Sequence, residues 1–168
     1  MLEKMYHKRL IGYAAIGYKA KAEKGLDDST DIIFDSTIFL SVYKNDLLSA
    51  AREILIVSPF ITKRRVTQML PFLSAAIVRK VKVVVVTRLA DEFREKDRPV
   101  LKQTLVLLVA ASVHVIFRSN IHQKFAICDQ KIVWYGSINL LSFGRAEESI
   151  MRIENAGIAD ELLGSIQK

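Results

Sequence analysis

Short apolar runs alternate along the chain with longer segments in which apolar residues recur at helical spacing. Three of the runs are rich in β-branched residues, as expected for strands buried on both faces: 53–58, 81–87 and 113–117. The segments with helical spacing precede or separate these runs: 41–52, 62–77 and 99–111. This alternation predicts an α/β fold, an α/β/α sandwich with a mixed, largely parallel sheet and helices on both faces.

The C-terminal third adds a hairpin to this outline. Apolar runs at 124–128 and 132–135 are separated by only three residues, a spacing that suits a tight turn between antiparallel strands. A last strand is expected at 149–153 and a last helix at 156–166. The hairpin is the reason to expect a mixed sheet.

Two local signals concern the helix expected at 62–77. Thr62 is expected to be its N-cap, and Pro71 is expected to kink or divide it. Upstream, residues 1–40 are expected to form a helical extension, with a turn-rich break at 24–29.

Length and composition bound the class of protein. The chain has 168 residues, which suits a single domain over residues 1–168, and its 51% hydrophobic content excludes a disordered or fibrous protein. No apolar run approaches the ~18 residues of a membrane span. Cys128 is the one cysteine, so a buried free thiol and a reducing, cytoplasmic setting are expected. Residues 1–22 loosely imitate a secretory signal, but Glu3 and two glycines favour an amphipathic helix there.

The segment from Ile121 to Asn139 gathers polar side chains around one strand. His122 and Lys124 are two residues apart, so on a strand their side chains point to the same face. Asn139 follows the next strand, where Gly136 is expected to let the backbone turn sharply and return the amide to the same edge. An imidazole, an ammonium and a carboxamide together suit a tetrahedral anion, because they supply a nucleophile or proton carrier, positive charge and hydrogen-bond donors.

The spacing of these residues is more specific than their identities. Written out, it is His122-x-Lys124-x4-Asp129-x6-Gly136-Ser137-x-Asn139. This pattern resembles the HKD signature of the phospholipase D superfamily, HxKx4Dx6GSxN, at every defining position. A chance match at these offsets is on the order of one in a million. The resemblance covers residues 45–155 as a family core, whereas residues 1–40 carry none of it.

The resemblance implies a metal-independent phosphodiesterase without cofactors, in which the motif histidine attacks phosphorus to give a phosphohistidine. Such an active site needs two HKD motifs, and this chain has one, because neither His7 nor His114 begins a second. A homodimer with the active site at its two-fold interface is therefore expected, in which one His122 attacks and its twin protonates the leaving oxygen. The paired Lys124 and Asn139 side chains would hold the non-bridging oxygens.

The family also has a carboxylate after the GSxN element that bonds the far nitrogen of the histidine. Glu147 and Glu148 are the candidates, and Glu148 is favoured because it immediately precedes the last strand. Asp129 and Ser137 are assigned to the catalytic motif as supporting residues. Asp129 is expected to bond backbone in the hairpin turn.

Basic residues favour a nucleic-acid substrate. The net charge of +7 would attract a polyanion, and loops at the carboxyl ends of the strands are expected to carry arginine and lysine to the site. Substrate contacts are therefore expected from seven residues: Lys63, Arg64, Arg118, Lys124, Ser137, Asn139 and Arg145. An endonuclease acting on DNA or RNA is the function that the sequence favours.

Alternatives remain for several of these assignments. The same chemistry cleaves phospholipid headgroups and cardiolipin, although membrane association is not expected because no apolar loop stands out. The chain also fits a non-catalytic nucleic-acid-binding module that acts beside a helicase-like partner. Trp134 is a candidate platform for a base, but its place on a buried strand favours a core role. His122, Cys128 and Asp129 have no usual metal-ligand spacing, so no metal is expected.

Overall fold

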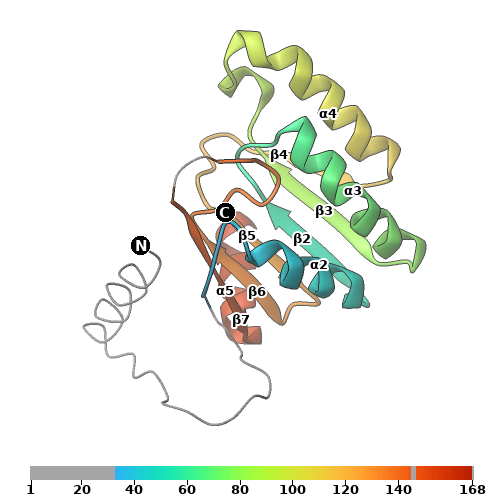
Figure 1. Ribbon diagram of the computed structural model, residues 1–168, viewed down its shortest axis with the longest axis vertical. Helices are drawn as coiled ribbons and strands as arrows, with labels where there is room; N and C mark the ends of the chain where they lie inside the picture. The colour runs from blue at the N-terminus through green and yellow to red at the C-terminus, as the bar shows by residue number, and fades with distance from the viewer. Residues whose placement is uncertain (1–32, 145–146, 168) are drawn as a thin grey trace. The chain divides into compact units, whose positions relative to one another are not determined.

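The computed structural model describes residues 33–144 and 147–167. Within these residues, seven strands form one sheet in the order β1-β7-β6-β5-β2-β3-β4 (Figure 1). The strands are β1 (Ile33–Asp35), β2 (Glu53–Val57), β3 (Lys82–Thr87), β4 (His114–Phe117), β5 (Phe125–Cys128), β6 (Ile132–Gly136) and β7 (Ser149–Glu154). Strands β2, β3 and β4 pair in parallel, and the other pairings of this sheet are antiparallel. The mixed α/β sheet is confirmed, but the expectation that it is largely parallel is corrected, because parallel pairing is confined to these three strands.

Helices cover both faces of the sheet, as the sequence predicts. Figure 1 shows α2 (Phe39–Ser49), α3 (Lys63–Val78) and α4 (Arg98–Ala110) over one face and α5 (Ala156–Gln167) over the other. Two short 3-10 helices, η1 (Ala90–Glu92) and η2 (Glu95–Asp97), lie in the connection from β3 to α4. None of the helices in the described residues is long and apolar enough to cross a bilayer.

Side chains of successive strand residues alternate between two cores, because a strand points them to opposite faces. In β2, Ile54 and Ile56 belong to the larger core beneath α2, α3 and α4. Val57 belongs to the smaller core beneath α5, and Leu55 packs against that core. Burial on both faces explains why this strand appears in the sequence as an uninterrupted apolar run.

The larger core is centred on Trp134, which is fully buried. Its ring packs against Phe34 and Tyr43, with centroids 5.3 and 5.4 Å away. The indole Nε1 donates to Asp46 Oδ2 at 2.7 Å, and Arg152 donates to both oxygens of the same carboxylate at 2.7 and 2.9 Å. Trp134 is therefore a core residue, and the alternative of an exposed platform for a base is wrong.

Two local expectations are confirmed, and two others are corrected in part. Cys128 is a buried free thiol, and burial raises its pKa to about 12. The hairpin turn is formed by Asp129 and Gln130, both with positive φ, as in a two-residue turn of type I′. Thr62 does precede α3, but its hydroxyl makes no cap bond and is buried without a partner in the described structure. Pro71 does not divide α3, which runs through it.

A helical extension is expected over residues 1–40, and residues 1–32 of it lie outside the described residues. Of its remaining residues, Ile33–Asp35 form β1 and pair with β7, so the expectation of helix is wrong there. This strand is only 3 residues long, and its residues alternate between partly buried and buried, a pattern too short to detect by periodicity.

Candidate active site

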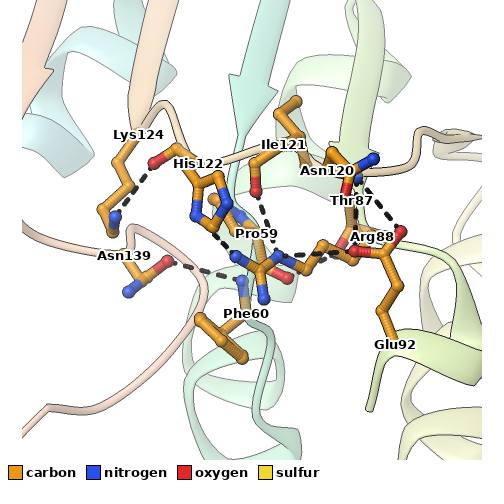
Figure 2. A network of polar contacts seen from close by, with 10 residues as sticks. All are labelled: Pro59, Phe60, Thr87, Arg88, Glu92, Asn120, Ile121, His122, Lys124 and Asn139. Carbon is orange, nitrogen blue, oxygen red and sulfur yellow. Dashed lines mark hydrogen bonds and ion pairs between the residues drawn. The ribbon is translucent and has the colours of Figure 1, made fainter.

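The site lies at one edge of the sheet, where β2 and β3 end and β5 begins. Ile121 is buried, and the extended segment that follows it carries His122 and Lys124 into β5. The imidazole is exposed, whereas the Lys124 side chain is partly buried and its Nζ donates to the His122 carbonyl at 3.0 Å. Figure 2 shows the Lys124 ammonium and the Asn139 carboxamide close together beside the His122 ring. The predicted convergence of imidazole, ammonium and amide is observed.

Two loops that are far apart in the sequence hold Asn139 in place. The buried Ser58 hydroxyl donates to Phe60 O at 2.7 Å and accepts from Leu141 N at 3.2 Å, and Thr62 N donates to Leu141 O at 2.8 Å. These bonds join the β2–α3 loop to the segment after β6. Phe60 N then donates to Asn139 Oδ1 at 3.4 Å, which turns the amide so that its N–H groups remain as donors for an anion.

Arg88 is one of the basic residues expected in the loops at the carboxyl ends of the strands, and it contacts the histidine directly, a contact that the sequence does not predict. Arg88 follows β3, and its Nη2 lies 2.8 Å from His122 Nδ1, while its Nε donates to Ile121 O at 3.0 Å. Its guanidinium also lies over the Phe60 ring, 4.6 Å from the centroid. Position 88 is 34 residues from the histidine, so sequence spacing gave no sign of the contact. The only available signal was that an arginine stands at the carboxyl end of a central strand.

The carboxylate expected to bond the far ring nitrogen of His122 makes no such bond in the described residues. Within the described residues no hydrogen bond joins Glu148 to His122, and the place on Nδ1 is taken by Arg88. Glu148 is partly buried beside Gly144, and Glu147 is exposed.

The GSxN element is fixed against β7. Ser137 Oγ accepts from Ser149 N at 3.0 Å and donates to Ser149 O at 3.2 Å, so this hydroxyl braces the backbone next to Glu148. A Cβ on Gly136 would overlap the backbone of Ser149 and Ile150. Glycine is needed at this position because β6 and β7 approach closely, and not because the backbone makes a left-handed turn. The expectation that Gly136 serves a sharp turn is therefore corrected.

Asp129 lies at the opposite end of β5 from His122. Its carboxylate accepts from the backbone N–H groups of Ala51, Arg52 and Glu53 at 2.8 to 3.0 Å, and not from its own hairpin turn. Partial burial opposes ionisation of this carboxyl, but the three backbone hydrogen bonds outweigh it and hold the pKa below its usual range. The motif aspartate therefore connects the hairpin to the start of β2 and does not reach the reacting groups.

The basic residues expected to bind substrate are dispersed. Lys63 and Arg64 are exposed in the first turn of α3, and Arg64 lies over the ring of Phe143, 4.6 Å from its centroid. Arg118 instead lines a groove of about 480 Å³ on the α5 face, and His122, Lys124 and Asn139 are not among the lining residues of that groove. Arg145 lies outside the described residues. No group of three metal-ligating side chains occurs among the residues that the structure describes.

Comparison with known proteins addresses the family. The family model described as "Cardiolipin synthase, PLD-like domain" matches residues 43–168, which is most of the chain. A comparison with curated proteins gives no match.

Solved structures share the fold at low sequence identity. Nuc from Salmonella typhimurium, a phospholipase D family member, is 19% identical with a TM-score of 0.65, over 80% of this chain and 90% of that one. NucT from Helicobacter pylori is 18% identical with a TM-score of 0.62, over 80% and 91%. TrmBL2, an archaeal chromatin protein, is 14% identical with a TM-score of 0.57, over 98% and 58%. From the family model and the shared fold, we conclude that this chain belongs to the phospholipase D superfamily of phosphodiesterases.

Proposed function

We propose that the chain is a metal-independent nuclease that cleaves DNA or RNA through a phosphohistidine intermediate at a homodimer interface. The observation that carries the proposal is the convergence of His122, Lys124 and Asn139 at one accessible edge of the sheet. Each supplies a different part of phosphoryl transfer, namely a nucleophile, a positive charge and a hydrogen-bond donor. Among the described residues, one chain brings a single imidazole to this edge, and the reaction needs two.

The second imidazole comes, in this proposal, from the twin subunit. The Nε2 lone pair of one His122 forms the bond to phosphorus, and the bond from phosphorus to the leaving oxygen breaks. The imidazolium of the twin His122 gives its proton to that oxygen. Water, deprotonated by the same twin, then attacks phosphorus and releases the first histidine, so that protons balance over the cycle. Lys124 and Asn139 of both subunits stabilise the charge on the non-bridging oxygens.

Two exposed aromatic side chains favour nucleic acid as the substrate, and one of them belongs to Phe60, the residue whose N–H donates to Asn139. Phe60 and Phe143 are each 40% exposed, which is high for a large apolar ring. An arginine lies on each ring, with Arg88 on Phe60 and both Arg64 and Arg65 on Phe143. Exposed rings paired with guanidinium groups suit a nucleic-acid strand whose bases stack while its backbone is neutralised. TrmBL2, which shares the fold, is described as binding DNA.

A lipid phosphodiester is the second candidate, and the wording of the matching family model favours it, because that model is described as a cardiolipin synthase domain. The exposed aromatic rings would then contact acyl chains instead of bases. A binding module without turnover is the third outcome that a test must separate.

The test compares the wild-type chain with His122→Ala in the presence of EDTA. Labelled single-stranded DNA, duplex DNA, RNA and cardiolipin-containing vesicles are incubated separately, and products are quantified. Nucleic-acid cleavage that resists EDTA and falls at least ~1,000-fold in His122→Ala supports the proposal. Arg52→Met, a charge change at the far end of β2, is the matched control and should retain activity. Turnover of lipid alone, or binding without turnover, would contradict the nuclease.

A further inference from the structure

The contact between Arg88 and His122 restricts the protonation state of the histidine. A guanidinium has five N–H donors, no acceptor and a permanent charge. At 2.8 Å from Arg88 Nη2, His122 Nδ1 must therefore be the acceptor and carry a lone pair. A neutral imidazole has one N–H, so in this arrangement the proton is on Nε2. The Nδ1–H tautomer and the imidazolium would both direct an N–H at the guanidinium.

Arg88 is held firmly in this position. Its side chain is only 14% exposed, its Nε donates to Ile121 O at 3.0 Å, and the carboxylate of Glu92 lies 3.9 Å from the same nitrogen. Glu92 also accepts from Asn120 N at 3.2 and 3.3 Å, which ties it to the segment that leads into the histidine (Figure 2). The Phe60 ring covers the guanidinium from another side. The contact with His122 is thus one part of a connected network and not a chance meeting of two exposed side chains.

The observed arrangement is not the one that the proposed reaction uses. Attack on phosphorus needs a lone pair on Nε2, and then the neutral ring carries its proton on Nδ1. The general acid is an imidazolium, which carries protons on both nitrogens. Both forms have an N–H at Nδ1, where Arg88 now lies. Arg88 must therefore leave Nδ1 in both subunits before turnover.

We infer that Arg88 is a positioning residue that keeps His122 in an inactive tautomer until the anionic phosphate of the substrate draws the guanidinium away. This inference rests on the proposed function of the site. A phosphate oxygen is a stronger acceptor for a guanidinium than a neutral ring nitrogen, and it can engage two N–H groups at once. In the attacking subunit, the Nε2 proton passes to water and Nδ1 takes a proton from water, so the ring stays neutral. In the twin subunit, Nδ1 takes up one proton from solvent, and the ring becomes the imidazolium that serves as general acid. Phosphate binding and activation of the histidine are thereby coupled.

The tautomer can be read directly by NMR of the full-length chain. In long-range ¹H–¹⁵N spectra of the free protein at pH 8, the His122 signals, assigned by their absence from His122→Asn, should show a protonated Nε2 and an unprotonated Nδ1. Addition of inorganic phosphate should convert Nδ1 to its protonated form. Observation of Nδ1–H in the free protein, or a tautomer unchanged by saturating phosphate, would overturn the inference.

Substitution of Arg88 gives a second readout. Arg88→Met should no longer fix the ring in one tautomer, so without phosphate the His122 nitrogens should report exchange between the Nε2–H and Nδ1–H forms. It should also bind phosphate at least about tenfold more weakly, because a charged hydrogen bond is lost. Arg52→Met is the matched control and should behave as wild type in both respects. If Arg88→Met does not fold, Arg88→Lys keeps the charge but cannot reach both Ile121 O and Nδ1, and it should partly release the tautomer.

These results are independent of turnover. If His122→Ala still cleaves nucleic acid, the proposed function fails whatever the NMR spectra show. If cleavage depends on His122 but the free protein has Nδ1–H, only the role of Arg88 is wrong.

Discussion

At the scale of single residues, the candidate site at the edge of the sheet, here called the active edge, combines groups whose chemistry the sequence reveals with contacts that it does not. The spacing of His122, Lys124 and Asn139 singles them out, and Figure 2 shows the three side chains together. Arg88 and Phe60 come from two other loops and meet the histidine only in the folded chain. Their contribution to binding can be measured separately from the chemistry.

Phe60→Leu tests whether the ring contacts bases. The substitution keeps an apolar side chain but removes the π-face, and loss of one stacked base should weaken single-strand binding by about tenfold. Phe72→Leu is the control, because a lysine, Lys44, lies over that ring at 4.9 Å just as Arg88 lies over Phe60. Affinity is measured by fluorescence anisotropy on His122→Ala, which prevents cleavage. Equal affinities for the two variants would exclude a stacking role for Phe60.

At the scale of elements, the motif aspartate organises the sheet. The carboxylate of Asp129 gathers three backbone N–H groups at the start of β2 and so fixes the β5–β6 hairpin beside that strand. β5 in turn begins directly after the segment that carries His122 and Lys124. Asp129 therefore supports the site through the strand that connects them, which explains how a residue outside the active edge belongs to the motif.

Asp129→Asn should cost about 2 kcal/mol of stability at neutral pH, because one backbone N–H loses its acceptor and the others lose a charged one. Asparagine tolerates the positive φ at this position, so the backbone is not strained by the change. The folded pKa lies below its unfolded value near ~3.9, so the contribution of the carboxylate is present above about pH 4 and is lost as pH falls through the folded pKa.

The difference in urea midpoint between wild type and Asp129→Asn should consequently shrink as the pH is lowered from 6 toward ~2.5. Asp160→Asn, on the exposed surface of α5, is the control and should show little difference at any pH. If the difference in urea midpoint stays the same in acid, the charge of the Asp129 carboxylate does not contribute to the loss of stability.

At the scale of the whole molecule, one chain supplies half of the proposed site. The described fold provides a single imidazole at the active edge. A homodimer with one shared site predicts that activity depends on the square of the wild-type fraction when subunits mix.

Equal amounts of wild type and His122→Ala, allowed to exchange subunits, should therefore retain about a quarter of the wild-type activity per total protein, whereas independent monomers would retain about half. Mixing wild type with the active variant Arg52→Met is the control. Retention of half the activity after verified exchange, or a monomer by analytical ultracentrifugation, would contradict the shared site.

The sequence alone determined the family and the order of helices and strands in 41–166, and it singled out the trio of the proposed site, because local periodicity and fixed motif spacing encode them. Tertiary structure decided the rest. In the folded chain, β1 pairs with β7, and Gly136 allows β6 and β7 to pack closely. Asp129 binds the backbone at the start of β2, far from His122, and Arg88 contacts Nδ1 of His122. These features depend on contacts between residues tens of positions apart, and such distances are set by how the strands pair and not by any local pattern.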